Sequence, residues 1–467
     1  MELLTDMEWK HCKSHIEGGL HVDRYKVQVL PTRPRDAEAP AGTGPHEKGY
    51  WDPFKERKLD HATTDGETLT HLLKASLGTG ILAMPAAFKN AGMITGIFAT
   101  IIVSLVCTHC SYVLVKCAHS LYHRKKVTTM TFADVGEVAF ANGPPWGRKF
   151  SKWARFSILF GLFLAYFGTC SVYTVIIAKN FKIVIEHHSH YNADIRFYIA
   201  VLLVPLILLS WIPNLKYLAP ISMLANFLMA GGLGITFWYL VWDLPSTLPD
   251  FFSTTIFAIE AIGVIMPLEN AMETPQHFVG ICGVLNRGMS GVTMIYILLG
   301  FLGFLKFGDA AQDNITNNLD ITQICQYLRS NCCFCTFGLQ FFVCLEIGWD
   351  AVKGYFPKRQ RFYNYIVRTV LVSGAVFLAI AVPTIGPFIN LIGALCFSLL
   401  GLIIPVFIEF VTYWDVGFGS FNWIVWKNIL VLIFGVLALF FGSATSIKGI
   451  AELYAPQNAA ADGFNRL

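Results

Sequence analysis

An apolar stretch at residues 69–90 (LTHLLKASLGTGILAMPAAFKN) is long enough to cross a bilayer but is interrupted near its middle. Ser76 and residues 78–80 (GTG) form the interruption, and Pro85 follows it. A helix in lipid must satisfy its own backbone hydrogen bonds, because the bilayer offers no substitute. Glycine and proline weaken those bonds, so protein or a ligand must take up the freed groups. The stretch therefore predicts a spanning helix that is broken at a binding site.

The composition agrees with a chain embedded in a lipid bilayer. Its 467 residues are 54% hydrophobic and 14% charged, and the mean hydropathy is +0.53, which is too apolar for an ordinary soluble protein. The net charge of +4 is small, and the basic residues lie in the N-terminal tail and in particular loops. This distribution argues against a nucleic-acid partner and is interpreted as a topology signal.

Apolar runs of about 20 residues predict eleven spanning helices. They lie near residues 69–88, 92–116, 154–181, 196–211, 218–241, 251–271, 289–307, 332–348, 364–383, 386–411 and 424–446. An odd number places the termini on opposite sides. The loops at 117–153 and 349–363 are rich in Lys and Arg and lie on the side of the N-terminus, which the positive-inside tendency assigns to the cytosol.

These spans divide the chain into four parts. The predicted parts are a mostly disordered cytosolic tail (1–66), a ten-helix core (67–411), the eleventh helix with its preceding loop (412–447) and a short extracytosolic C-terminal tail (448–467). The one Asn-x-Ser/Thr sequon begins at Asn314, in a loop on the extracytosolic side. Asn314 is therefore a predicted glycosylation site.

A second interrupted segment lies five spans after the first, as an inverted repeat requires. The sixth segment reads FFSTTIFAIEAIGVIMPLEN (251–270), with Glu260 in mid-span, Gly263 shortly after it and Pro267 one turn on. A carboxylate inside a span is costly and usually functional, although a structural hydrogen-bonding role is the alternative. Spans one to five and six to ten then form two halves of a 5+5 inverted repeat.

Several segments resemble the proton-coupled amino acid transporters, in the amino acid/auxin permease group of the amino acid-polyamine-organocation superfamily. Two segments are similar to the first and sixth spans of that family: HLLKASLGTGILAMPAAFKNAG (71–92) and FAIEAIGVIMPLENAM (257–272). Two more segments also resemble the family: PNLKYLAPISMLANFLM (213–229) and FLKFGD (304–309). The likeness runs from about Pro45 to the eleventh span. It implies an all-α polytopic membrane protein with a 5+5 inverted-repeat (LeuT-like) transporter core and broken helices 1 and 6.

The resemblance also implies roles for particular residues. His71 matches the first-span histidine linked to proton coupling in the family, Gly78 to Gly80 match its unwound substrate-binding turn, and Glu260 matches the glutamate of its sixth-span motif. The sequence departs from the family at residues 75–76 (Ala-Ser, where relatives often have Gly-Asn) and at Ala261. These departures bear on the choice of substrate more than on the mechanism.

The chemistry of an amino acid zwitterion fits two broken helices. The helix half that begins near Thr79 and Gly80 would present backbone N–H groups to the carboxylate, and carbonyls freed at the breaks would accept from the ammonium. The expected substrate-binding residues are Ser76, Leu77, Gly78, Thr79, Gly80, Phe257, Ala258 and Ile259. His71 and Glu260 are the expected proton-coupling residues, with H⁺ as the coupling ion and no metal or cofactor. A structural histidine, hydrogen-bonded at a helix end, is the alternative for His71.

Weaker motifs are assigned to packing or to loops. Residues 288–291 (GMSG) imitate a serine-protease turn, but no histidine follows His277 to act as base, so we expect no enzyme activity. Residues 107–110 (CTHC) lie inside a span and are expected to pack. A solvated loop is predicted to contain His187, His188 and His190. One local disulfide, whose pairing stays open, is predicted among Cys325, Cys332, Cys333 and Cys335.

Three functions remain open at this point. The leading prediction is a secondary active transporter that moves small neutral amino acids, such as glycine, alanine and proline, together with protons by alternating access. A sodium-coupled carrier of the same fold is the nearest alternative, because carbonyls of a broken helix also bind Na⁺. The third is an amino-acid-sensing membrane receptor with little flux. The sequence leaves the cell membrane and the lysosomal membrane both open.

Overall fold

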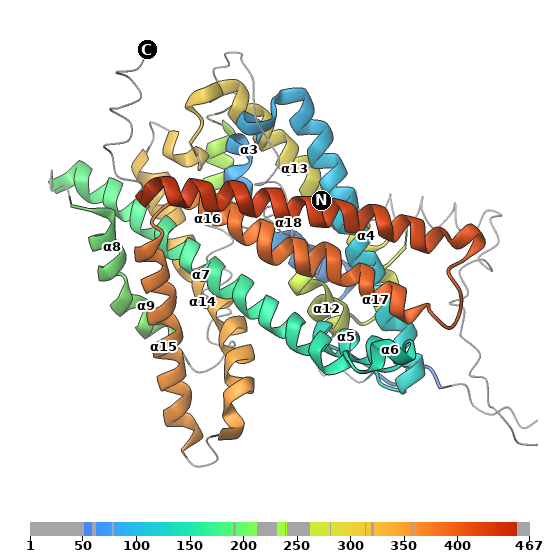
Figure 1. The fold of residues 1–467 in the computed structure, drawn as a ribbon. Coiled ribbons are helices and arrows are strands. Elements are labelled where there is room, and N and C mark those ends of the chain that lie inside the picture. The colour runs from blue at the N-terminus through green and yellow to red at the C-terminus, as the bar shows by residue number, and fades with distance from the viewer. Residues whose placement is uncertain are drawn as a thin grey trace, which may run out of the picture.

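The computed structural model describes most of the chain after residue 50. The described residues are 51–57, 62–76, 79–189, 193–212, 231–238, 240, 262–280, 282–312, 314–318, 322–355 and 359–454. They form helices, together with one isolated β-bridge between Thr63 and Met272 (Figure 1). The all-helical architecture predicted from the sequence is confirmed for this part of the chain.

Within the described ranges, short connections join most of the helices. In chain order they are α2 (Asp65–Ser76), η2 (Thr79–Ala83), α3 (Met84–Ala91), α4 (Met93–Lys125), α5 (Phe132–Ala141), α6 (Pro145–Arg148), α7 (Ser151–Ser189), α8 (Ile195–Val201), α9 (Leu203–Ser210), α12 (Ile262–Ala271), η3 (Pro275–Phe278), α13 (Val284–Phe307), η4 (Gly308–Ala310), η5 (Ile315–Asn318), α14 (Thr322–Val352), η6 (Lys353–Tyr355), α15 (Gln360–Ala381), α16 (Ile385–Ile392), η7 (Gly393–Ile403, a π-helix), α17 (Ile404–Thr412), η8 (Ser420–Asn422) and α18 (Trp423–Tyr454).

Six described helical stretches are long and apolar enough to cross a membrane. They are Met93–Lys125, Ser151–Glu186, Val284–Ala310, Gln360–Ala381, Ile385–Thr412 and Trp423–Ala451, and a shorter apolar stretch is Ile195–Ser210. The six coincide with the predicted second, third, seventh, ninth, tenth and eleventh spans, and α14 covers the eighth. The fifth span and the first half of the sixth lie largely outside the described residues, so the count of eleven stays a prediction.

The predicted break in the first span is confirmed. α2 ends at Ser76, a 3₁₀ turn runs from Thr79 to Ala83, and an α-helix resumes at Met84. Pro85 lies in the first turn of α3, where its missing N–H removes no intrahelical bond. The break therefore follows from the glycines before the proline and is completed by the proline itself.

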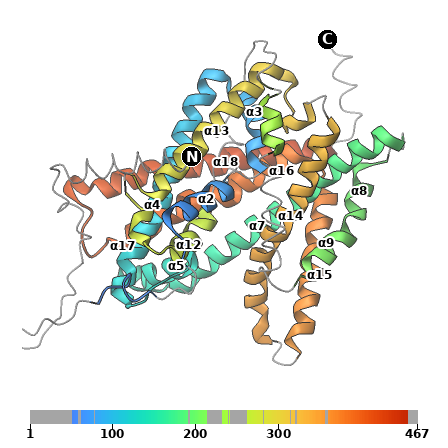
Figure 2. The same cartoon turned by 180° about the vertical axis from the view of Figure 1, so that it is seen from behind.

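Both halves of the broken helix, α2 and α3, pack against α13, and Figure 2 shows the molecule from behind. A Cβ added at Gly288 would lie 2.6 Å from Leu72 of α2, and one added at Gly300 would lie 2.5 Å from the Phe88 ring of α3. Glycines thus allow α13 to approach both halves closely. Gly288 belongs to the GMSG segment, so its place in the fold agrees with a packing role.

We expect Gly300→Ala to lower stability while Gly291→Ala has little effect. The Phe88 ring is fully buried and has no room to retreat from a new methyl group, whereas the atom nearest a Cβ at Gly291 is 3.6 Å away, on Leu73. Overpacking of this kind typically costs about 1–3 kcal/mol. Thermal unfolding of the two purified variants in detergent measures the difference. Equal midpoints would contradict the close approach of α13 and α3.

The ends of the helices agree with the predicted alternation of spans. Lys89, at the end of the first span, donates to the backbone oxygen of Asp309 at 2.5 Å, directly after the seventh span. The two odd-numbered spans therefore end on one side. α7 and α14, which hold equivalent positions in the expected repeat, pack against each other. The inverted repeat itself stays an expectation.

The structure differs from the prediction in several connections. α4 continues to Lys125, and α5 and α6 occupy much of the segment 117–153 that was expected to be a loop. α18 continues to Tyr454, past residue 448, where the C-terminal tail was expected to begin. Hydropathy detects the part of a helix that suits lipid, and these helices extend beyond that part with polar residues.

α5 is held by charged side chains outside the predicted spans. Thr131 and Asp134 form a capping box at its start, and Arg155 of α7 contacts both Asp134 and Glu137, the latter at 2.9 Å. Burial raises the pKa of Asp134, but the hydrogen bonds from Thr131 and Arg155 outweigh this effect and hold the pKa below its usual range. Asp134 therefore stays ionised and stabilises the start of α5.

Candidate functional site

The break in the first span contains a buried serine. Ser76 is 3% exposed, and its backbone oxygen accepts a hydrogen bond from the hydroxyl of Tyr296, a fully buried residue of α13. The Ser76 hydroxyl oxygen is buried and has no hydrogen-bond partner among the described residues. The Ser76 carbonyl is also expected to accept from a substrate ammonium. Tyr296 donates one hydrogen bond to this oxygen, which has two lone pairs, so this role stays a prediction. The hydroxyl is the Ser76 group that has no hydrogen-bond partner among the described residues.

The turn after the break is buried as well. Thr79 and Gly80 begin η2, and Gly80 and the residues that follow it, up to Phe88, are buried. The first amides of a helix have no intrahelical acceptor, so a buried start requires another partner. Leu77 and Gly78 lie outside the described residues. Their predicted roles, like those of Thr79 and Gly80, stay predictions.

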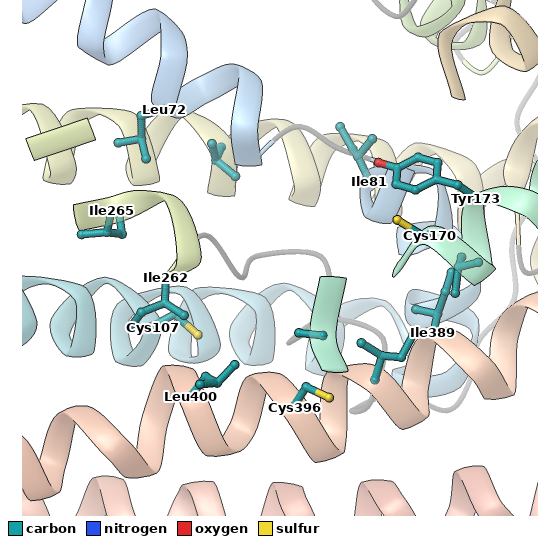
Figure 3. Close-up of a cluster of buried hydrophobic side chains, with 14 of the residues drawn as sticks. Leu72, Ile81, Cys107, Cys170, Tyr173, Ile262, Ile265, Ile389, Cys396 and Leu400 are labelled. Carbon is teal, nitrogen blue, oxygen red and sulfur yellow. The ribbon is translucent and has the colours of Figure 1, made fainter. Parts of the chain in front are cut away.

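Buried hydrophobic side chains lie near both halves of the broken first helix (Figure 3). Tyr173 and Cys170 of α7 lie near Ile81 of η2, while Ile262 of α12 and Cys107 of α4 lie toward the other half of the broken helix. All five side chains are nearly or fully buried. A charged group placed among these side chains would lose its hydration without gaining a partner.

The sixth span is described from Ile262 onward. Phe257, Ala258, Ile259 and Glu260 lie outside the described residues, so their predicted roles are untested. α12 begins close to α7, because a Cβ added at Gly263 would lie 2.5 Å from the hydroxyl oxygen of Tyr166. The helix that follows the predicted second break therefore approaches α7 at Gly263, whereas it packs mainly on α2 and α4.

His71 lies within α2 with its side chain exposed, next to the fully buried Leu72. No hydrogen bond of His71 is found within the described part of the chain, so the structural alternative gains no support there. One turn earlier, hydrogen bonds from the backbone and the side chain of Thr64 lower the pKa of Glu67, and the nearby His71 lowers it further. The structure does not bring His71 to the buried groups of the break, and its proton role stays a prediction.

Two further predictions concern residues on the predicted extracytosolic side of the membrane. Asn314 is 3% exposed, which is an unfavourable setting for an attached glycan in this conformation. Its glycosylation stays a prediction. Cys333, one of the four cysteines considered for a local disulfide, is fully buried. The disulfide stays a prediction.

Sequence reasoning missed a buried polar cluster centred on Glu269, near the end of α12. The Glu269 side chain is fully buried, and three side chains from two other parts of the chain point at its carboxylate. Arg57, from the segment before α2, has a nitrogen 3.3 Å from Oε1, His119 Nε2 lies 3.0 Å from the same oxygen, and the Tyr122 hydroxyl donates to Oε2 at 2.9 Å. Together with Asn270, these residues are called the Glu269 cluster.

Backbone oxygens complete the Glu269 cluster. Arg57 donates to the carbonyl oxygens of Thr128, at 2.6 and 3.0 Å, and of Glu269, at 3.0 Å. Asn270 accepts from Tyr122 at 3.2 Å and donates to Met130 O at 2.9 Å. The cluster therefore joins three parts of the chain at the ends of the second and sixth spans, on the side from which the chain enters the first.

A partial signal for this cluster was present in the sequence. Glu269 and Asn270 belong to the PLENAM segment of the family resemblance, but they lie at the edge of the sixth span. Arg57 lies within residues 1–66, which we expected to be mostly disordered. Residues 51–57 are instead packed on the helices, with Phe54 against the ring of His119 at a centroid distance of 5.0 Å.

Comparisons with known proteins agree with this architecture. The family described as "Transmembrane amino acid transporter protein" matches residues 61–448. The chain is similar to the "proton-coupled amino acid transporter-like protein pathetic" of Drosophila melanogaster, with 56% identity over 468 residues, 97% of this chain and 98% of that one. It is also similar to amino acid transporter ANT1 of Arabidopsis thaliana, with 25% identity over 421 residues, 82% of this chain and 92% of that one.

Among solved structures, the chain is similar to the manganese transporter of Eremococcus coleocola, with 13% identity, a TM-score of 0.47 and coverage of 87% of this chain and 93% of that chain. A likeness at this level carries no argument about substrate. The family match covers most of the chain, including both broken-helix segments and the Glu269 cluster except for Arg57. The chain belongs to the transmembrane amino acid transporter protein family.

Proposed function

We propose that this protein is a secondary active transporter that moves small neutral amino acids together with protons by alternating access. The observation that carries the proposal is the broken first helix, in which the hydroxyl of Ser76 is buried and has no hydrogen-bond partner among the described residues. In a chain of the amino acid transporter family, such a break supplies polar groups for a zwitterion without a charged side chain.

The two charges of the zwitterion are matched by different groups. The amides that begin η2 at Thr79 and Gly80 face the substrate carboxylate. The hydroxyl of Ser76 and carbonyls near the sixth-span break, at Phe257 to Ile259, face the ammonium. Tyr296 fixes the Ser76 carbonyl and so holds the end of α2 in place. Because a charged group would lose its hydration among the buried hydrophobic side chains near the break, the proposed substrates have small neutral side chains, such as those of glycine, alanine and proline.

Proton coupling is supported by the name of the Drosophila relative and by the ionisable residues in the predicted spans. His71 is the proposed residue that loads and releases the proton, because histidine changes charge between about pH 5 and 8. Glu260 is the second proposed proton-coupling residue. The coupled movement of a neutral zwitterion and one H⁺ carries one net positive charge.

We expect acidic outside medium to raise the uptake of glycine, alanine or proline and to generate an inward positive current. One pH unit is worth 1.36 kcal/mol per proton and supports roughly tenfold accumulation. In His71→Ala this accumulation should fall to near the level without a gradient. Radiolabelled uptake into proteoliposomes at two outside pH values, with current recorded in parallel, measures both effects.

Thr70→Ala is the matched control, because Thr70 is the exposed neighbour of His71 on α2 and bonds only to the backbone of that helix. It should keep the pH-driven accumulation. Accumulation that depends on the Na⁺ gradient and not on pH would mean that Na⁺, rather than H⁺, is the coupling ion. Saturable binding with negligible uptake would indicate a receptor, and unchanged accumulation in His71→Ala would assign the proton role to Glu260.

A further inference from the structure

We propose that Glu269 is a proton-binding site whose proton is exchanged for Arg57: the guanidinium and a proton compete for the same buried carboxylate, and the departure of Arg57 opens the N-terminal side of the molecule. The structure shows the state in which Arg57 is bound. The proposal deepens the proposed function and rests on it for the role of this exchange in transport.

The geometry provides one carboxylate for one cation. Glu269 is fully buried and the Arg57 side chain is 3% exposed, so each neutralises the other away from water. Tyr122 donates its hydroxyl hydrogen to the carboxylate, and Nε2 of His119 lies 3.0 Å from Oε1. In the proposed bound state the imidazole of His119 is neutral and donates from Nε2, so the Arg57–Glu269 pair carries no net charge and no further proton is bound.

The departure of Arg57 changes the charge balance of the Glu269 cluster. Glu269 lies on α12 among helices and cannot follow Arg57 to the surface, so its charge would be buried without a partner. One proton restores neutrality, either on Glu269 itself or on His119, whose Nε2 is 3.0 Å from Oε1. One positive charge leaves as the guanidinium and one arrives as H⁺, so the net charge of the Glu269 cluster is unchanged by the exchange.

The position of Arg57 connects this exchange to the broken helices. Arg57 lies on the short segment before α2, the first half of the first broken helix, and Glu269 lies on α12, which follows the predicted break in the sixth. Arg57 also holds the carbonyl of Thr128, between α4 and α5. A path on this side of the molecule requires α2, α12 and α4 to separate. Arg57 joins α12 to the connection after α4, beside the bonds that His119 and Tyr122 of α4 make to Glu269.

The other titratable groups near this junction are placed differently. His123 and Asp52 lie at its edge, with the His123 ring 6.0 Å from Phe54. Asp65 of α2 is engaged by His277 at 2.9 Å and by Thr274 at 2.9 Å, between α2 and η3. Glu273, one turn beyond Glu269, is exposed, and its backbone N–H bonds to Thr63.

The sign of the pH dependence follows from the exchange. The released state binds one more proton than the bound state, so a fall in pH favours release, by up to about tenfold per pH unit for one proton. Amide hydrogen exchange detects the release, because Phe54 and Glu56 amides bond within the segment and the Thr63 amide donates to Ala271 O of α12 at 2.8 Å.

The experiment uses the full chain in lipid nanodiscs at about pH 7.5 and about pH 5.5, with exchange of these three amides corrected for the intrinsic pH dependence of amide chemistry. We expect the corrected rate of amide hydrogen exchange to rise more than roughly tenfold at the lower pH in the unsubstituted protein. Glu269→Gln should exchange rapidly at both pH values, since a neutral amide neither holds Arg57 nor binds the proton. His119→Gln should weaken the response while leaving the carboxylate in place.

Glu273→Gln is the matched control, because it removes an exposed carboxylate one turn away and should respond like the unsubstituted protein. Equal corrected exchange at the two pH values, or a full response that survives in Glu269→Gln, would overturn the proposal. The exchange measurement needs no substrate, so its outcome is separate from that of uptake. A response without acid-driven uptake would contradict the proposed transport, and acid-driven uptake without a response would contradict this site.

Discussion

Gly80→Val is expected to abolish amino acid uptake in a protein that still folds and inserts. Gly80 is buried in the turn that follows the break, and its amide is one of the two that begin η2. A valine side chain there would fill the space through which a carboxylate approaches the backbone. Each lost charge-assisted hydrogen bond costs about 1.5–3 kcal/mol, roughly ten- to a hundredfold in affinity, and exclusion of the carboxylate removes more than one.

The measurement is uptake together with equilibrium binding by the purified protein, with monodispersity on size exclusion as the test of folding. Gly66→Val is the matched control, because Gly66 lies on α2 and no atom lies within 4 Å of a Cβ built there. It should retain uptake. Uptake at the normal rate in Gly80→Val would remove this turn from the substrate path.

Substrate analogues test the same interaction without a substitution. Alanine should compete for uptake, whereas alanine methyl ester, which keeps the ammonium but lacks the carboxylate charge, should compete poorly. We expect a difference of roughly ten- to a hundredfold between the two. Equal competition, with the ester shown to remain intact, would mean that the break serves gating or another ligand.

The break was predictable because its cause is local. Glycines at positions 78 and 80 and a proline at 85 weaken helical hydrogen bonds within one stretch of sequence, and α2 ends two residues before the first of these glycines. The long apolar helices were predictable for a similar reason, since a bilayer of fixed thickness demands about 20 apolar residues. Both features depend on residues that are consecutive in the sequence, and both are present in the structure.

The partners of the freed groups were not predictable in this way. The hydroxyl of Tyr296 donates to the backbone oxygen of Ser76, which lies 220 positions earlier in the sequence. Nothing in the sequence around either residue predicts that the two are in contact. The Glu269 cluster likewise joins residues 57, 119 and 269. Hydropathy assigns each residue to a span or a loop, but the contacts between them depend on how the helices pack. A buried carboxylate at the end of a span was therefore overlooked beside Glu260 in mid-span.

Arg57→Ala is expected to destabilise the protein strongly near neutral pH and less so in acid. The substitution leaves the fully buried carboxylate of Glu269 without its cation, and breaking a buried pair in this way typically costs about 3–5 kcal/mol. As the pH falls, a proton neutralises the carboxylate in place of Arg57, so the cost should shrink. Thermal unfolding midpoints of the purified protein at about pH 8 and about pH 5.5 measure the change.

The double variant Arg57→Ala/Glu269→Gln separates the buried charge from the loss of packing. Glutamine keeps an oxygen for Tyr122 and carries no charge, so the double variant should be more stable than Arg57→Ala alone at about pH 8 and should show little dependence on pH. Arg155→Ala is the control for removal of a guanidinium from a carboxylate, because Arg155 and Asp134 are 42% and 35% exposed. A pair that accessible to solvent is typically worth about 0–1 kcal/mol, so a cost of this size in Arg57→Ala would mean that water or a neighbouring group already compensates Glu269.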